Sequence, residues 1–250
     1  VADEPQRLVV VGPTVAKVGK KIEVKMRLED KWGNPIGTKF EEVELKKVGV
    51  TRLKRNWGPL EGVSNPIVVR EKLGLQYFWA DFHGQTGETV GTGSIEDYFQ
   101  FARDWAFLDM SSIQSNDFEV TNEFWAKIQE TTQKFNQPGK FLAFPGYEWS
   151  GNTSNGGDRN VIYELEGMQI YRSSHASLED FGDVDNDAAH VTDLFKELDA
   201  AKTVVFAHVG GRFANLNWHK DGIEVAVEVH SDWGTFEGVV FEALKNGYKV

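Results

Sequence analysis

Apolar and polar residues alternate with a period of two in the first third of the chain. The clearest case is residues 21–29, in which every second residue is apolar and the others are charged. Val43 and Leu45 repeat the pattern between charged neighbours, and residues 8–11 form a short apolar run. Such alternation is typical of strands with one buried face. Because no helical periodicity interrupts these segments, the pattern predicts a small β-sandwich-like module over residues 1–75.

From residue 76 onward the pattern changes to alternating strands and helices. Short apolar runs predict strands at 76–82, 107–112, 141–144, 160–165, 203–207 and 225–229. Apolar residues spaced three and four apart predict helices from Ser94 and over 121–135, 189–201 and 235–246. Ser94 and Asp97 have the spacing of a capping box, which marks the start of a helix. Alternating strands and helices indicate an α/β fold with a parallel sheet or barrel.

Histidine and glutamate side chains follow several of these predicted strands. His83 ends the first strand, Glu148 follows the third, and His208 and His230 follow the last two. The carboxyl ends of strands meet at one edge in β/α folds, so these side chains are expected to converge. Imidazole nitrogen and carboxylate oxygen bind divalent metals, and water bound to such a metal becomes a nucleophile near neutral pH. The sequence therefore predicts a hydrolytic metal site.

Composition limits the types of metal ligand at the site and the classes of binding partner. The chain has no cysteine, so any transition-metal site must use His, Asp, Glu or amide oxygen ligands. With 27 Lys and Arg against 38 Asp and Glu, the formal charge is −11, which argues against nucleic acid or an anionic membrane as partner. No apolar run approaches the roughly 18 residues of a membrane span. The expected partner is a small-molecule substrate, and nothing in the sequence indicates the oligomeric state.

Absence of cysteine suits the cytoplasm and the bacterial periplasm alike, and no targeting segment is visible. The compartment therefore stays open.

Around these candidate ligands the sequence resembles the PHP (polymerase and histidinol phosphatase) superfamily. It looks most like an uncharacterised PHP-like branch that carries an N-terminal β-module. The matching stretches are residues 81–88, 144–149, 156–161, 207–211 and 227–231. The resemblance implies an α/β fold in which residues 76–250 form a distorted (β/α)7 barrel with a metal cluster at the strand ends. The Asp-x-His that normally closes the superfamily's motifs is missing, so the expected barrel is incomplete at the C-terminus.

The resemblance also implies a set of metal ligands. His83 matches the first His of the superfamily's His-x-His motif, and Gln85 stands where the second His would be. Glu148 matches the glutamate that bridges two metals, and His208 matches the next conserved His. An amide oxygen is a weaker ligand than imidazole, so a metal at the position of Gln85 is expected to bind more weakly. The expected cofactor is one to three divalent ions of zinc, manganese or iron.

Two motifs of the superfamily differ in this chain. The second motif supplies Asp-His after its strand, but residues 112–115 hold neither, and Asn116 and Asp117 are the nearest substitutes. Glu228 and His230 both fall near the end of the last strand. We expect His230 to be the ligand because it is the last residue out.

Arg159 and His175 are the candidates for substrate contact. Arg159 lies in a Gly-rich turn, where it either binds a phosphate or carboxylate or forms a structural ion pair. His175 either protonates the leaving group or is a loop histidine without such a role. Together with Asp117, these residues complete the expected catalytic set. An anionic substrate would need local positive charge from the metals and Arg159.

Three functions follow from this reading. The first is a metal-dependent hydrolase, phosphoesterase-like, that uses a metal-activated water. The second is a non-catalytic PHP-like binding protein with a degenerate metal site, favoured by Gln85 and Ile113 at positions where the superfamily has histidine. The third is a glycoside hydrolase in which Glu148 works with Glu228 or Asp117 as acid and base.

Overall fold

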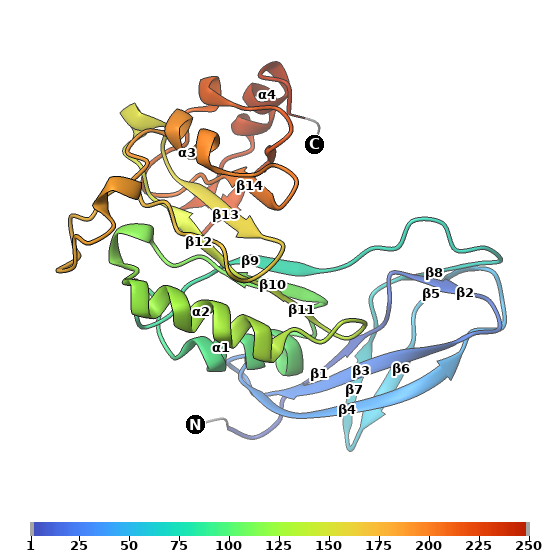
Figure 1. Cartoon of the computed structure of the whole chain (residues 1–250). Coiled ribbons are helices and arrows are strands. Elements are labelled where there is room, and N and C mark those ends of the chain that lie inside the picture. Colours follow the sequence, from blue (N-terminus) through green and yellow to red (C-terminus); the bar gives the residue numbers. More distant parts are fainter. Residues whose placement is uncertain (1–2, 249–250) are drawn as a thin grey trace. The chain divides into compact units, whose positions relative to one another are not determined.

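The computed structural model describes residues 3–248, which divide into two compact units (Figure 1). The first unit comprises residues up to Trp79 together with Gln100–Asp109, and the second comprises Ala80–Phe99 and the residues from Met110 onward. Every candidate site residue lies in the second unit. Within residues 3–248, no helix combines the length and the apolar character that crossing a membrane requires.

The N-terminal part of the first unit consists of short strands. They are β1 (Arg7–Val11), β2 (Val15–Lys17), β3 (Lys21–Glu29), β4 (Pro35–Glu44), β5 (Gly49–Thr51), β6 (Lys54–Trp57), β7 (Leu60–Val63) and β8 (Ile67–Arg70). They form the sheets β1-β3-β4 and β2-β8-β5 and the hairpin β6-β7. The alternation over 21–29 becomes β3, whose Val24 and Met26 are buried in the core. The strand prediction for this segment is confirmed.

Strands of the second unit form two sheets and a hairpin. The strands are β9 (Ala80–Gly84), β10 (Met110–Ile113), β11 (Leu142–Phe144), β12 (Gly146–Trp149), β13 (Arg159–Tyr163), β14 (Thr203–Ala207), β15 (Glu224–Val227), β16 (His230–Ser231) and β17 (Gly234–Thr235). The sheet β11-β10-β9 is parallel, and the sheet β12-β13-β14-β15 is mixed. The short antiparallel pair β16-β17 makes the hairpin.

Four α-helices are present in the described residues, and the last two are shorter than predicted. They are α1 (Ile95–Gln100), α2 (Asn122–Phe135), α3 (Val191–Glu197) and α4 (Gly238–Lys245). The capping box before α1 is confirmed, because the backbone N–H of Asp97 donates to Ser94 Oγ at 3.1 Å. Thr121 caps α2 by accepting from the Phe124 N–H at 3.0 Å, and Trp125 lies on the buried face of α2. A π-helical turn, Phe101–Trp105, follows α1.

The predicted (β/α)7 barrel is wrong. Among residues 3–248 each sheet has two to four strands, and none closes into a barrel. Parallel neighbours require a long crossover, usually a helix. Between β12 and β13 the chain makes only a loop with the short 3₁₀ turn Thr153–Asn155, so β13 returns antiparallel. The sequence pattern missed β12 altogether, because that strand follows β11 after the single residue Pro145.

The mixed sheet brings several strand ends to one edge. Strands β12, β14 and β15 run in one direction, and β13 runs in the other. Their register places Glu148 opposite Asn160, and Arg159 opposite Ala207. Asn116, just beyond β10, forms a parallel bridge with Glu148, which links the two sheets at this point. The carboxyl ends of β12, β14 and β15 therefore share one edge with the amino end of β13.

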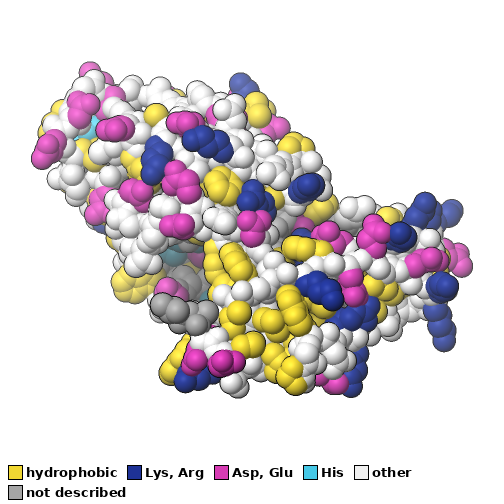
Figure 2. Space-filling view, turned by 90° about the horizontal axis from the view of Figure 1, so that it is seen from below, with side chains coloured by type: hydrophobic (Ala, Val, Ile, Leu, Met, Phe, Trp, Pro, Cys, Tyr) yellow, Lys and Arg dark blue, Asp and Glu magenta, His cyan; other side chains and the backbone are white. Residues whose placement is uncertain are grey.

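Charged side chains of both signs are spread over the molecular face shown in Figure 2. Acidic groups lie among basic ones there, as on an ordinary solvated protein surface.

Gly146 is the position where β12 approaches its neighbours most closely. A Cβ atom there would lie 2.3 Å from Gln114 Nε2 and 2.7 Å from the Val161 carbonyl oxygen, which cannot move aside. We expect Gly146→Ala to lower the free energy of unfolding by about 1–3 kcal/mol through overpacking, measured by urea denaturation. Gly238→Ala, at a position with nothing within 4 Å, is the control and should cost nothing. Equal stability of both variants would contradict this packing.

Candidate metal centre

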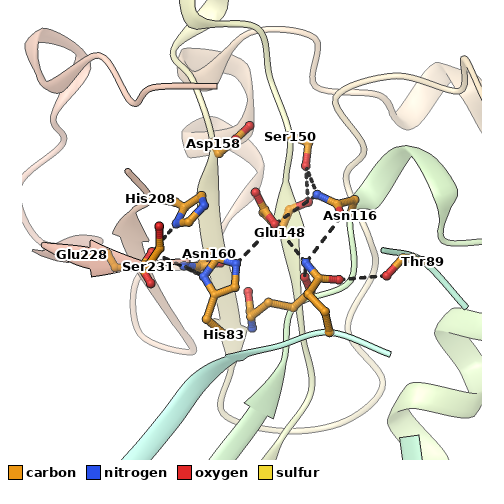
Figure 3. A network of polar contacts seen from close by, with 12 residues as sticks. His83, Thr89, Asn116, Glu148, Ser150, Asp158, Asn160, His208, Glu228 and Ser231 are labelled. Carbon is orange, nitrogen blue, oxygen red and sulfur yellow. Dashed lines mark hydrogen bonds and ion pairs between the residues drawn. The ribbon is translucent and has the colours of Figure 1, made fainter. Parts of the chain in front are cut away.

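Two histidines and a glutamate converge at the shared edge of the strands. His83 lies on β9, Glu148 on β12 and His208 directly after β14, and one ligand atom of each lies within 4.8 Å of the others. His83 Nε2 is 3.5 Å from Glu148 Oε2, and the two imidazole centroids are 4.3 Å apart. Figure 3 shows both rings facing the Glu148 carboxylate. The structure thus brings together three of the predicted ligands.

Glu148 is held through one of its two carboxylate oxygens. Oε2 accepts hydrogen bonds from Asn116 Nδ2 at 3.0 Å and from Gln85 Nε2 at 3.1 Å, and it is also the oxygen nearest His83 (Figure 3). Because these contacts all converge on Oε2, they leave Oε1 available to a cation. The side chain is almost fully buried, so its orientation is fixed before any ligand binds.

Gln85 supports Glu148 rather than offering its own oxygen. Its Nε2 also donates to the Gln114 carbonyl at 2.6 Å, and its Oε1 accepts from Thr89 Oγ1 at 2.8 Å. A carbonyl only accepts, so the amide nitrogen must point this way and the amide oxygen must point toward Thr89. The structure therefore places Gln85 beside the ligands with its donor toward Glu148.

Glu228, just after β15, is the fourth charged group of the cluster. Its Oε2 forms a hydrogen bond with His208 Nδ1 and lies 3.4 Å from His83 Nδ1. Burial would raise the pKa of Glu228, but His208 and His83 outweigh it and lower this pKa to about 2. Burial would lower the pKa of His83, but the carboxylates of Glu148 and Glu228 raise it to about 10.

Asp158 adds a further buried carboxylate at the amino end of β13. Burial, followed by repulsion from Glu148, raises the pKa of Asp158 to about 8. Its Oδ2 accepts the Arg212 backbone N–H at 3.0 Å, whereas Oδ1 is buried without a hydrogen-bond partner among the described residues. A carboxyl group whose pKa is raised in this way holds a proton rather than an uncompensated charge, and a bound cation would stabilise its ionised form.

Gly210 keeps the second nitrogen of His208 accessible. A Cβ atom on Gly210 would lie 1.9 Å from His208 Nε2, so any larger residue would occupy the space in front of that atom. Because Glu228 already holds Nδ1, the tautomer that donates from Nδ1 presents a free Nε2 to this space. The donor set of two imidazoles and one carboxylate fits a divalent cation such as Zn²⁺, Mn²⁺ or Fe²⁺.

These residues line a pocket of about 680 Å³, called here the central pocket. Its lining includes His83, Glu148, Asp158, His208 and Glu228. All of them come from the second unit, so the site is complete within one compact body.

His230 lies apart from the cluster. Its exposed ring contacts Thr235 Oγ1 through Nδ1 at 2.7 Å, across the hairpin β16-β17. His230 was expected to be the ligand because it follows the strand predicted over 225–229, which assumed that this strand continues up to it. Because β15 ends at Val227 and the chain then turns into the hairpin, Glu228 rather than His230 reaches the other histidines.

Arg159 is a structural residue in this fold. Its side chain is fully buried, its Nε lies 2.5 Å from Glu224 Oε1, and Nη1 donates to the Gly156 carbonyl at 2.7 Å. Nη2 donates to the Asn215 carbonyl at 3.1 Å. Of the two roles left open for Arg159, the structure therefore shows the ion pair, and the central pocket lacks Arg159 in its lining.

Asp117 is likewise enclosed by protein. Its oxygens accept from the backbone N–H groups of Ser150, at 3.0 Å, and of Ser173. Burial outweighs these hydrogen bonds and raises the pKa of Asp117 to about 7. Asp117 ties the segment after β12 to the loop at Ser173, and its neighbour Asn116 is the one that reaches Glu148.

His175 lies in a separate charged cluster. Its Nδ1 is 2.8 Å from Asp187 Oδ2, and its Nε2 is 3.0 Å from Asp183 Oδ1. Arg172 pairs with the other oxygen of Asp183 at 2.7 Å. Since both ring nitrogens face carboxylates, which only accept, the doubly protonated ring fits best. The structure therefore does not bring His175 to the group formed by His83, Glu148 and His208.

The sequence reasoning missed or ranked second several residues of the site. Asn160 Nδ2 contacts His83 Nδ1 at 3.0 Å, and Asn116 and Asp158 also belong to the site. Period-two alternation would have been a signal for Asn160, since it stands opposite Glu148 in an antiparallel pair. That signal requires the pairing of β12 with β13, which the predicted parallel barrel excluded.

Comparisons with known proteins give a family and two relatives. The family model described as "Protein of unknown function (DUF3604)" matches residues 75–210, a range that includes His83, Glu148 and His208. An uncharacterized protein of Chlamydia pneumoniae is 19% identical over 279 residues, which cover 98% of this chain and 44% of the relative. An uncharacterized protein of Chlamydia muridarum (strain MoPn / Nigg) is 21% identical over 187 residues, covering 61% of this chain and 30% of the relative.

The chain thus spans less than half the length of these curated relatives. No solved structure matches it.

The His175 cluster makes part of the stability depend on pH. Burial would lower the pKa of His175, but Asp187 and Asp183 raise it above the ordinary 6.5. The protonated ring therefore stabilises the fold below pH 6.5, and this contribution is lost as the pH rises through the folded-state pKa. We expect His175→Gln to lower the melting temperature more at about pH 6 than at about pH 9, measured with chelator present.

His190→Gln is the matched control, because His190 contacts Thr192 and Trp218 in the same unit. An equal loss of melting temperature at both pH values in His175→Gln would contradict the imidazolium assignment.

Proposed function

Starting from the finding that the chain belongs to the DUF3604 family of proteins of unknown function, we propose that it is a metal-dependent hydrolase. The observation that carries this proposal is the convergence of His83, Glu148 and His208 within 4.8 Å, at strand ends that line a pocket. The resemblance to PHP phosphoesterases favours an ester of phosphate or a similar acid as substrate. Because the chain spans under half of its relatives, the proposal concerns the activity of this site.

His83, Glu148 and His208 would hold one divalent ion, of zinc, manganese or iron. Such an ion lowers the pKa of bound water toward neutrality and polarises an ester oxygen. The free Nε2 of His208 and the free Oε1 of Glu148 are the atoms best prepared for it, because the other atom of each side chain is already occupied. His83 would contribute through the nitrogen that faces Glu148.

Neighbouring residues orient these ligands. Glu228 accepts from His208 Nδ1 and so fixes the ring and its tautomer. Gln85 and Asn116 donate to Glu148 Oε2 from two different loops, so rotation of the carboxylate would break two hydrogen bonds. These contacts position the donor atoms before a cation arrives, which is what a precise catalytic site requires.

Metal content tests the proposal directly. We expect about one ion per chain by elemental analysis, a lower melting temperature in chelator, and ester hydrolysis that chelator abolishes and added Zn²⁺ or Mn²⁺ restores. His208→Ala and Glu148→Gln should lose both the metal and the hydrolysis, by about a hundredfold or more in rate. His230→Ala is the matched control and should keep both, because His230 lies outside the cluster.

Wild-type protein with far less than one ion per chain, and with a melting temperature that chelator does not change, would overturn the proposal of a metal-dependent hydrolase. This result would favour the non-catalytic binding protein instead. If the protein hydrolyses a glycoside and this activity persists in chelator, the glycoside hydrolase is favoured, with two carboxyl groups as acid and base.

Gly210 provides a second test that leaves every ligand in place. Gly210→Ala would put a methyl group 1.9 Å from His208 Nε2, so we expect the metal content to fall well below one per chain. The neighbouring Gly211→Ala would make only an ordinary contact, 3.4 Å from Trp233, and should bind metal like the wild type. Circular dichroism establishes that both variants are folded. Full metal content in a folded Gly210→Ala variant would exclude His208 Nε2 as a ligand.

A further inference from the structure

The central pocket has one guanidinium and one exposed indole in its lining. Arg212 is the only Lys or Arg that lines it in the described part of the chain. The lining also includes five carboxylates, those of Asp81, Glu148, Asp158, Glu228 and Asp232. Neither Arg212 nor Trp233 takes part in the metal cluster, so both remain available to a ligand.

Arg212 has a fixed backbone and a guanidinium with free donors. Its carbonyl accepts the Asp158 N–H at 2.9 Å, and its own N–H donates to Asp158 Oδ2 at 3.0 Å. The guanidinium lies over the Phe118 ring, 4.9 Å from the centroid, and 3.8 Å from Asp158 Oδ1. It donates no hydrogen bond to another described residue, and 36% of the side chain is exposed. A guanidinium placed in this way suits the paired oxygens of an oxyanion.

Trp233 lies beside Arg212 in space because both flank the same glycine. Trp233 stands in the turn between β16 and β17, and its Cζ2 would be 3.4 Å from a Cβ on Gly211, the residue before Arg212. The indole is 69% exposed although it lines the pocket. An exposed indole held against a glycine backbone offers a flat surface on which another ring can stack.

The charges of the lining limit the charge of the ligand. The five lining carboxylates outnumber the charges of Arg212 and of one divalent ion by two, so the lining repels a second negative charge on the ligand. A tetrahedral ester with a single negative charge therefore fits better than a doubly charged one. The adjacent indole adds a preference for a ligand that carries a planar ring.

We propose that Arg212 and Trp233 select singly charged tetrahedral esters of a ring alcohol, such as aryl phosphodiesters or aryl sulfates. This inference rests on the hydrolase proposed above. In the reaction, the water oxygen bonds to phosphorus or sulfur and the bond from that atom to the ring oxygen breaks. One water proton leaves with the ring alcohol, and the other stays on the acid product. Arg212 binds the non-reacting anionic oxygens, and Trp233 stacks on the ring.

Binding of ligands that cannot be hydrolysed tests the two contacts separately from catalysis. Calorimetry on the full chain uses benzenesulfonate, cyclohexanesulfonate and the neutral methyl phenyl sulfone. We expect Arg212→Gln to weaken benzenesulfonate about tenfold or more and to leave the sulfone unchanged. Trp233→Ala should weaken benzenesulfonate about fivefold and cyclohexanesulfonate much less. Arg70→Gln and Trp32→Ala, at exposed positions of the first unit, are the controls.

Turnover then distinguishes the substrates. Wild-type protein should hydrolyse bis(4-nitrophenyl) phosphate or 4-nitrophenyl sulfate with a kcat/KM about tenfold or more above that for 4-nitrophenyl phosphate, which is doubly charged near pH 8. Whichever of the first two is preferred identifies the acid. A preference for the doubly charged ester would overturn the proposal. So would an affinity for benzenesulfonate that is the same in Arg212→Gln and Trp233→Ala as in the wild type.

Metal analysis of the same samples separates this inference from the hydrolase itself. Wild-type protein that is free of metal and inactive, but still binds benzenesulfonate through Arg212, would overturn the proposed hydrolase activity. It would support Arg212 as an anion-binding residue. Metal-loaded, active protein whose binding does not depend on Arg212 or Trp233 would overturn only the selection proposed here.

Discussion

Three carboxylates lie at one edge of the sheet β12-β13-β14-β15, of which Glu148 and Asp158 are buried and Glu228 is half-buried. Burying negative charge is costly unless donors or cations compensate it. Glu228 is compensated by two imidazoles, and Glu148 by two amides, but one oxygen of Asp158 has no hydrogen-bond partner among the described residues. The cost of ionising these carboxylates without compensation explains why this edge suits a cation, and why a single guanidinium at its rim matters for an anionic ligand.

The direction of the strands makes this concentration of charge achievable. Strands β12, β14 and β15 end at the same edge, and β13 begins there. Residues on neighbouring strands, such as Glu148 and Asn160, therefore face each other with a rigid backbone behind them. Glycine keeps the space in front of the ligands open at Gly210. The site thus depends on a mixed sheet, and a parallel barrel is not required to bring the ligands together.

Charged residues in this fold divide into those that hold the structure and those that face the pocket. Arg159 and His175 are ion-paired with residues of the fold, so they stabilise loops. The Arg212 guanidinium lies near Asp158 and Phe118 but donates no hydrogen bond to another described residue. In sequence all three are polar residues near turns, and residue type and spacing do not distinguish a buried ion pair from a substrate contact. The distinction depends on what packs around each side chain.

Local patterns were enough to predict the strand over 21–29, the start of α1 at Ser94 and the helix after Thr121, because alternation and capping act between near neighbours in the chain. They were also enough to select His83, Glu148 and His208, since each stands at or just beyond a strand end.

The tertiary structure alone decided the direction of β13, which depends on a short loop and on pairing between distant strands. It also decided between Glu228 and His230. The hairpin that diverts His230 forms around Trp233 and Gly234, where the turn, and not the strand pattern, sets the path of the chain. Sequence by itself therefore determined the residue types of the candidate site and several of the local elements. Long-range pairing and burial determined which charges meet, because those interactions join residues that no local pattern connects.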